Sequence, residues 1–196
     1  APTGALVSPI QPVAAATSRL TVCAVPATLR LHTSSSEHAA VDRYDDAADF
    51  WDAKYANEAY HFGTAPNAFL AAQAHRLQPG WRALAVADGE GRNGVWLAER
   101  GLQVDALEIS PRAIEKARAL AESRGVAGRY AARRADLADC DLDRGTYDLV
   151  AAIFIQFAPP EMRADLFRRL QAALAPGGLL LLQGYRPEQV ELGTGG

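Results

Sequence analysis

Cysteine, methionine and long apolar runs are scarce in this sequence. Its 196 residues include two cysteines, Cys23 and Cys140, which are too few for a disulfide framework, so we expect a cytoplasmic protein. Charged residues interrupt every apolar run before it reaches the roughly 18–20 residues of a membrane-spanning helix, so no membrane partner is expected. The 20 Lys+Arg against 23 Asp+Glu give no basic excess, which argues against a nucleic-acid partner.

Acidic residues are absent from the first 36 positions, where Arg19 and Arg30 are the basic side chains. The remaining 160 residues carry 18 Lys+Arg and 23 Asp+Glu, a net charge of −5. This change in composition predicts a disordered or irregular extension over residues 1–38 and one folded domain over 39–196. A translated upstream stretch and an organelle transit peptide, which is typically acid-poor and contains Arg and Ser, are alternative interpretations of the extension.

Short apolar runs alternate with helical patterns from Glu37 onward. The predicted strands cover residues 82–87, 103–108, 129–134, 147–154 and 179–182. Helices are predicted within 39–58, from Thr64 as cap to Leu77, over 92–100, from Ser110-Pro111, and from Pro159-Pro160 to 176–178. This alternation indicates an α/β fold in which a parallel sheet lies between two helix layers.

A glycine-rich turn follows the first of these strands. Gly89, Gly91 and Gly94 satisfy the G-x-G-x-x-G pattern, where glycine permits a tight turn and the following helix offers free N–H groups to a phosphate or carboxylate. Glu108 ends the next strand, where a carboxylate can accept both hydroxyls of a ribose. Together these features indicate an adenosine-containing cofactor and leave NAD and S-adenosylmethionine open. A purely structural turn and a solvated strand-end acid are the alternatives.

The segments from Gly89 to Ala98 and from Val104 to Ser110 resemble class I S-adenosylmethionine-dependent methyltransferases, and most closely their tellurite-resistance and thiopurine methyltransferase-like group. Further matches are Phe50–Tyr55, Phe62–Asn67, Ala135–Leu137, Tyr147–Val150 and Leu174–Leu179. The resemblance implies a three-layer Rossmann-like sandwich with strand order 3-2-1-4-5. Because that family has two more strands, we expect strands 6 and 7 to be missing, a chain truncated at its C-terminus, and an exposed edge along the fifth strand.

The resemblance also implies which residues bind the cofactor, S-adenosylmethionine. The backbone at Ala87, Gly89 and Gly91 is expected to approach it, Glu108 to hold its ribose, and Asp136 to accept from the adenine amino group. The full expected set is Trp51, Phe62, Gly63, Ala87, Asp88, Gly89, Gly91, Asn93, Glu108, Ile109, Asp136, Leu137, Ile153 and Phe154. Two positions depart from the family: Ala85 replaces an acid and Ala87 a glycine, and Asp88 is expected to face the methionine ammonium instead.

Several of these residues have plainer interpretations. Ile109, Ile153 and Phe154 also fit an ordinary core, Trp51 and Phe62 ordinary helix packing, and Asp136 a turn cap. The expected reaction is methyl transfer to a small-molecule acceptor, with a thiol or chalcogen nucleophile that needs no general base. We therefore expect no catalytic side chain. We also expect no bound metal, and a monomer. The alternatives are an NAD-binding Rossmann oxidoreductase and a non-catalytic cofactor-binding module.

Overall fold

The computed structural model describes residues 19–25 and 47–185. Their strands form one six-stranded sheet in the order β1-β6-β5-β2-β3-β4, and every neighbouring pair is parallel. The strands are β1 (Arg19–Val25), β2 (Arg82–Val86), β3 (Gln103–Glu108), β4 (Tyr130–Arg134), β5 (Tyr147–Ile153) and β6 (Leu174–Tyr185). Without β1, this order is the predicted 3-2-1-4-5 arrangement, which is therefore confirmed.

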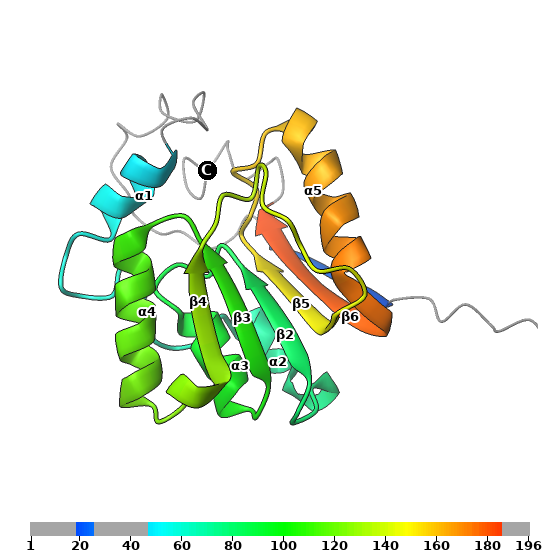
Figure 1. Ribbon diagram of the computed structural model, residues 1–196, viewed down its shortest axis with the longest axis horizontal. Coiled ribbons are helices and arrows are strands. Elements are labelled where there is room, and N and C mark those ends of the chain that lie inside the picture. Colours follow the sequence, from blue (N-terminus) through cyan, green and yellow to red (C-terminus); the bar gives the residue numbers. More distant parts are fainter. Residues whose placement is uncertain (1–18, 26–46, 186–196) are drawn as a thin grey trace, which may run out of the picture.

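Helices cover both faces of the sheet, with α4 and α5 on opposite sides (Figure 1). They are α1 (Ala47–Lys54), α2 (Ala68–Ala72), α3 (Arg92–Glu99), α4 (Pro111–Ser123) and α5 (Pro160–Ala173), with short 3-10 turns at Ala74–Arg76 and Ala127–Arg129. Ser110 caps α4 as predicted, because its side chain accepts a hydrogen bond from the Ala113 N–H at 3.1 Å and Pro111 fits the first turn. The helices and strands therefore make the three layers that the sequence indicates.

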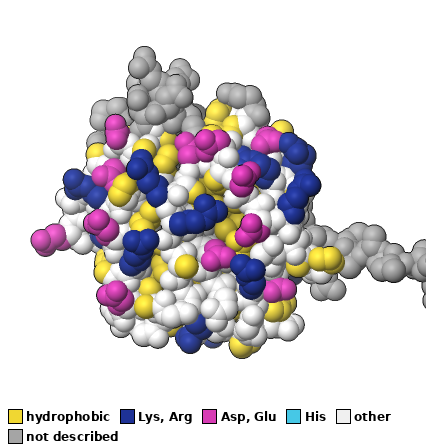
Figure 2. Space-filling view, viewed as in Figure 1, with side chains coloured by type: hydrophobic (Ala, Val, Ile, Leu, Met, Phe, Trp, Pro, Cys, Tyr) yellow, Lys and Arg dark blue, Asp and Glu magenta, His cyan; other side chains and the backbone are white. Residues whose placement is uncertain are grey.

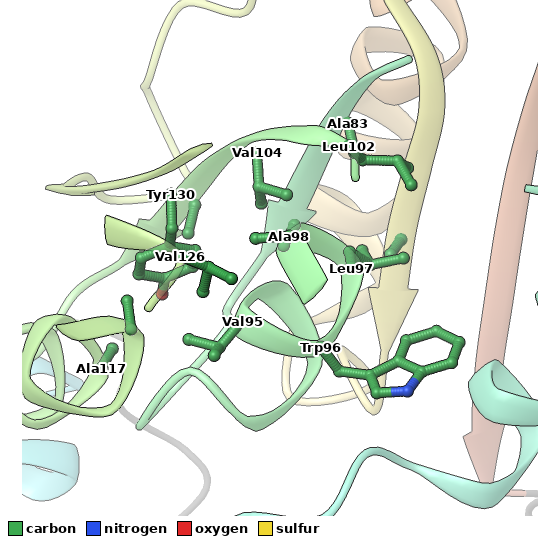
Figure 3. Close-up of a cluster of buried hydrophobic side chains, with 14 of the residues drawn as sticks. Ala83, Val95, Trp96, Leu97, Ala98, Leu102, Val104, Ala117, Val126 and Tyr130 are labelled. Atoms are coloured by element: carbon green, nitrogen blue, oxygen red, sulfur yellow. The ribbon is translucent and has the colours of Figure 1, made fainter. Parts of the chain in front are cut away.

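Two apolar cores lie on the two faces of the sheet. Ala83 and Ala85 of β2 pack toward α3 and α4, whereas Leu84 and Val86 pack toward α5, because successive strand residues point to opposite faces. Figure 3 shows part of the first core, where Trp96 of α3 extends away from Val126 and Tyr130. Burial on both faces explains why β2 and β5 read as continuous apolar runs.

The edge of the sheet differs from the prediction. β1 pairs with β6 from Arg19↔Leu179 to Val25↔Tyr185, so the expectation that the fifth strand is an exposed edge is wrong. β1 also lies within residues 1–38, so that segment is not irregular throughout; its other residues lie outside the described part of the chain. Within residues 19–25 and 47–185 no strand follows β6. The predicted absence of strands 6 and 7 concerns residues 186–196, which lie outside the described part of the chain.

Two local boundaries also differ. The helix predicted from Thr64 starts at Ala68, and its cap is Asn67, whose side chain accepts from the Leu70 N–H at 3.1 Å. The last strand starts at Leu174 rather than Leu179, because Leu174 already pairs with Tyr147 before the register shifts. A strand irregularity of this kind adds residues to one strand without changing the hydrophobic pattern, so composition alone does not locate it.

Candidate cofactor site

The glycine-rich turn joins β2 to α3 at the carboxyl edge of the sheet. Ala87, Gly89 and Gly91 all have left-handed backbone, with φ of 50°, 57° and 88°. A left-handed conformation costs an L-residue energy that glycine avoids, so Ala87 occupies a position that favours glycine. The structure thus gives a backbone reason for the glycine that the family resemblance implied there. Gly91 is the N-cap of α3, as the strand–turn–helix pattern predicted.

Glu108 braces this turn from the end of β3. Its side chain is 6% exposed, and its two oxygens accept hydrogen bonds from the backbone N–H groups of Gly89 at 2.8 Å and Ser110 at 3.0 Å. Burial raises the pKa of the Glu108 carboxyl above its usual value, and these backbone hydrogen bonds oppose that change. The acid is therefore not solvated at a strand end. It connects the glycine-rich turn to the start of α4.

The other two glycines of the motif serve packing between helices. A Cβ atom on Gly91 would lie 2.7 Å from the Ala117 Cβ and 2.9 Å from its Cα, on α4. A Cβ on Gly94 would overlap the Asp88 carboxylate and lie 2.7 Å from Cε2 of Tyr130. Gly91 and Gly94 thus let α3 approach α4 and β4 closely, whereas Gly89 lies beneath the Tyr55 hydroxyl, 2.9 Å from where its Cβ would be.

Asp88 lies buried under the turn, with both oxygens bonded inside the protein. The Gly94 N–H donates to its Oδ1 and the Tyr130 hydroxyl donates to its Oδ2, each at 2.9 Å. Burial raises the pKa of the Asp88 carboxyl to about 7, and the two hydrogen bonds oppose this rise. In this structure the contacts of Asp88 are those of a residue that holds the turn, rather than of one that faces a ligand amine.

This burial predicts a pH dependence of stability. In the unfolded chain Asp88 ionises at its ordinary pKa of 3.8, whereas in the folded chain its pKa is about 7. The unfolded state therefore releases this proton first, and raising the pH from 4 to 7 should lower the free energy of unfolding by on the order of 4 kcal/mol. Urea denaturation across this pH range should show that Asp88→Asn removes most of the loss. The same substitution at exposed Asp139 is the control, and parallel profiles of wild type and Asp88→Asn would contradict the assignment.

Three aromatic side chains, Trp51, Tyr55 and Phe62, form a cluster over the turn, which we call the aromatic cover. Tyr55 of the segment after α1 is 5% exposed; it stacks on Trp51 at 5.7 Å between ring centroids and meets Phe62 edge-on at 6.4 Å. Burial, together with the carboxylates of Glu108, Glu90 and Asp88, raises the pKa of the Tyr55 hydroxyl. The structure thus brings predicted Trp51 and Phe62 to the site. It adds Tyr55, which sequence reasoning missed although it lies four residues after Trp51.

The cover is held to the turn by polar contacts. Glu90 accepts from the His61 N–H at 2.6 Å and forms a buried ion pair with Lys116 of α4. The Lys116 ammonium also donates to the carbonyls of Asn57 and Ala59, at 2.9 and 2.8 Å. The residues just before the Phe62–Asn67 motif are therefore tied to α4 as well as to the turn. Glu90 and Lys116 were not predicted, because nothing in the sequence pairs positions 26 residues apart in different elements.

Two neighbours at the start of α3 hold the rest of the cover. Asn93 is buried, and its side-chain oxygen accepts from the Asn67 N–H at 2.9 Å. Arg92 donates to the Phe62 carbonyl at 3.2 Å, and its guanidinium lies 5.5 Å from the Phe62 ring centroid. Asn93, a predicted binding residue, thus anchors the cover in this structure. Gly63, also predicted, lies exposed in the same segment with φ of 69°.

The remaining predicted residues lie at the carboxyl ends of the neighbouring strands. Asp136 follows β4, and its side chain accepts from the Ala138 N–H at 2.8 Å, which is the turn-capping geometry that sequence analysis left open. Leu137 is buried in the core beside α5. Ile109 is half-buried after β3, Ile153 ends β5, and Phe154 follows it. Phe154 has φ of 60°, so β2 and β5 both end in left-handed residues at this edge.

Charges of both signs are interspersed on the face of the molecule in Figure 2. Within the described part of the chain, no helix combines the length and the apolarity that a membrane crossing requires. The arrangement at the turn consists of a buried carboxylate, left-handed backbone and an aromatic cover. A carboxylate at the end of this strand suits the hydroxyls of a ribose.

Comparisons with known proteins agree with this geometry. A family model described as a methyltransferase domain matches residues 83–178. A thiopurine S-methyltransferase of Azotobacter vinelandii is 31% identical over 169 residues, and the match covers 74% of each chain.

Solved structures share the fold. A Geobacter sulfurreducens methyltransferase in complex with S-adenosylhomocysteine has a TM-score of 0.53 at 22% identity, covering 67% of this chain and 53% of that one. The [4+2]-cyclase SpnF has a TM-score of 0.58 at 19% identity, covering 69% and 58%. The chain thus spans between half and three fifths of the length of these two proteins. With the family model and the Azotobacter relative, the fold and the glycine-rich turn show that the chain belongs to the S-adenosylmethionine-dependent methyltransferases.

Proposed function

We propose that this chain transfers the methyl group of S-adenosylmethionine to the sulfur of a small-molecule thiol. The observation that carries the proposal is the buried Glu108 carboxylate, which joins the end of β3 to the Gly89 backbone under the aromatic cover. S-adenosylmethionine is the cofactor of the family to which the chain belongs. The thiol acceptor is supported by the 31% identity to a thiopurine S-methyltransferase.

The residues of the turn fit this cofactor. A carboxylate offers about four lone-pair positions. The N–H groups of Gly89 and Ser110 use two of these at Glu108, and the Ile109 backbone N–H uses a third, which leaves one for a hydroxyl of a ribose. Gly89 has no side chain, so its backbone is open to close approach once Tyr55 moves from above it. Asp88 accepts hydrogen bonds from Gly94 and Tyr130 and lies beneath the turn, so its contacts in this structure are to the protein.

The role of the chain is then to align the reactants and exclude water. When bound, S-adenosylmethionine supplies an activated methyl on a sulfonium, which a thiolate takes up as the bond to the departing thioether breaks. Trp51 and Tyr55 cover the turn and Phe62, 48% exposed, lies at the edge of this cover; the Glu90–Lys116 ion pair ties the segment just before Phe62 to the turn and to α4. A cover of this kind excludes water from the reacting groups. Thiols ionise more readily than hydroxyls, so the acceptor needs no general base from the protein.

Calorimetric titration of the full chain with S-adenosylhomocysteine tests the cofactor assignment, and we expect saturable binding at one site. Release of S-adenosylhomocysteine in the presence of S-adenosylmethionine and thiophenol then tests turnover, with phenol as the matched oxygen acceptor. Methyl transfer to thiophenol but not phenol is the expected result. Absence of binding would overturn the cofactor assignment, and binding without turnover on thiols would favour a non-catalytic module. Titration with NADH is the control for the oxidoreductase alternative.

We also propose that the protein is a cytoplasmic monomer that does not bind nucleic acid, and that residues 39–196, to which β1 adds an edge strand, form its methyltransferase domain. The mixed charges on the face in Figure 2 support the absence of a nucleic-acid partner. Sedimentation of the full chain tests the oligomeric state, where a single monomeric species is expected.

A further inference from the structure

Gln183 of β6 is a buried polar residue that the proposed function does not use. Its side chain is 7% exposed, and its carbonyl oxygen, Oε1, accepts no hydrogen bond from the described residues. A buried acceptor without a partner is costly, because it has lost water and gained nothing in exchange. Gln156 Oε1, just after β5, is another buried side-chain oxygen with no partner among the described residues. Such an atom is open to a donor that the described residues do not supply.

The strand register places Gln183 in the same row as Glu108. Glu108, Ala87 and Ile153 follow the paired residues Leu107, Val86 and Ala152, and Ile153 itself pairs with Gln183. The row crosses β3, β2, β5 and β6 at the carboxyl edge, where the arrowheads meet in Figure 1. Glu108 and Gln183 are thus about three strand spacings apart, roughly 14 Å, on either side of the glycine-rich turn.

Both side chains belong to the same face of the sheet. Alternate residues of β6, Leu179 and Leu181, pack in the core beneath α3 and α4, as do Val104 and Ala106 of β3. Two residues further along each strand, the same face presents Gln183 and Glu108, because side chains alternate with period two. Ile153, which lies between them, is buried but packs in neither core cluster. The row of Glu108, Ala87, Ile153 and Gln183 therefore lies where the core ends, at the carboxyl edge of the sheet.

An aromatic pair lies next to Gln183. Phe154 stacks on Tyr185 with ring centroids 4.6 Å apart, and the Phe154 N–H donates to the Gln183 backbone carbonyl at 2.7 Å. Tyr185 also acts electrostatically on Arg92, as do Tyr55 and Asp88, which offset part of the fall in the Arg92 pKa that burial causes. Tyr185 is two residues after Gln183 in β6, so its side chain belongs to the same face of the sheet as Gln183 and Glu108. Flat rings beside an unpaired amide suit a flat ligand with a hydrogen-bond donor.

We propose that Gln183 determines acceptor specificity: its Oε1 receives a hydrogen bond from an O–H or N–H of an aromatic thiol that lies against Phe154 and Tyr185. This inference rests on the proposed function, since it places the acceptor on the β6 side of the turn and the cofactor on the β3 side. The amide oxygen is an uncharged acceptor, so it favours a ligand with an O–H or N–H donor over an anion that has none. A ring without a donor leaves the buried oxygen unpaired and binds more weakly.

The test compares two ligands that differ in one hydroxyl, 4-(methylthio)phenol and thioanisole, by calorimetry on the full chain saturated with S-adenosylhomocysteine. One neutral hydrogen bond predicts about 3- to 10-fold tighter binding of the phenol by the wild type. Gln183→Met, which keeps the side-chain length without the acceptor, should bind both ligands as weakly as the wild type binds thioanisole. Gln103→Met, at the exposed opposite end of β3, is the control and should keep the preference.

A second measurement separates recognition from a structural role. Because Gln183→Met removes a buried unpaired oxygen, we expect the midpoint of thermal unfolding of the ligand-free chain to rise. A lower midpoint would show that the oxygen has a partner in the free protein, and an unchanged ligand preference would show that it does not contact the acceptor; either result overturns the inference. If S-adenosylhomocysteine fails to bind, the proposed function falls and the inference with it. Binding of S-adenosylhomocysteine with no change in preference refutes the inference alone.

Discussion

Glu108→Gln should weaken the binding of S-adenosylhomocysteine by about 10- to 100-fold, which corresponds to about 1.4–2.7 kcal/mol. The wild-type carboxylate accepts from the backbone N–H groups of Gly89, Ser110 and Ile109 and, as proposed, from one hydroxyl of a ribose. A glutamine side chain has one oxygen, and its NH₂ group would face a backbone N–H. A buried donor left unpaired costs about 1–3 kcal/mol, so the turn itself should also lose stability.

Calorimetry gives the affinity and urea denaturation gives the stability of the same variant. Glu115→Gln makes the same chemical change on the exposed face of α4 and is the matched control for both measurements. If Glu108→Gln unfolds too readily to bind, Glu108→Asp is the second variant, because it keeps the negative charge on a shorter side chain. We expect Glu108→Asp to bind S-adenosylhomocysteine more tightly than Glu108→Gln does. Wild-type affinity in Glu108→Gln would show that this carboxylate braces the turn without touching the cofactor.

Gly91→Ala should lower the free energy of unfolding by about 3 kcal/mol or more, a large part of the 5–15 kcal/mol that a typical domain has. Left-handed backbone costs an L-residue roughly 1–2 kcal/mol, and Gly91 has φ of 88°. The new methyl group would also lie 2.7 Å from the Ala117 Cβ and 2.9 Å from its Cα, so α3 and α4 would have to separate. Overpacking of this kind adds typically 1–3 kcal/mol.

Gly125→Ala separates these two costs. Gly125 also has left-handed backbone, with φ of 67°, but its Cβ would meet nothing within 4 Å. The control should therefore lose only the backbone contribution, about 1–2 kcal/mol. Urea denaturation of both variants measures the difference, which we attribute to the contact between α3 and α4. Equal losses would mean that helix packing does not require glycine at position 91.

Much of the fold follows from local pattern. The strand over 103–108 and the helix cap at Ser110 agree with prediction to the residue, because both depend on neighbours within a few positions. The wrong prediction about the sheet edge concerns a contact between residues that are far apart in the sequence. The pairing of β1 with β6 joins residues about 160 positions apart in the sequence, and no periodicity in an acid-poor segment indicates which edge it will cover. The predicted Thr64 cap failed for a local reason, since Asn67 competes for the same role.

The site divides in the same way. The glycine pattern and Glu108 were found from sequence, because a tight strand–turn–helix and a strand-end acid constrain residue type locally. The distinction between Gly89, which lies under the cover, and Gly91 and Gly94, which pack helices, needed the contacts. Tyr55 and Glu90 lie inside segments that match the family, but nothing in the sequence singled them out as site residues, and Lys116 lies outside those segments. The binding roles of the predicted residues stay predictions, which titration of the variants will test.

The sequence by itself determined the class of fold and the position of the glycine-rich turn, because hydrophobic period and backbone conformation are properties of consecutive residues. The order of the central strands was implied by the resemblance to the methyltransferase family. The tertiary structure alone decided which side chains meet at that turn. Asp88 reaches Tyr130 across 42 positions and Glu90 reaches Lys116 across 26, through contacts that exist once α3 and α4 pack on the sheet. It also decided that Gln183 shares a row with Glu108, because strand register is set by pairing and not by the strand's own residues.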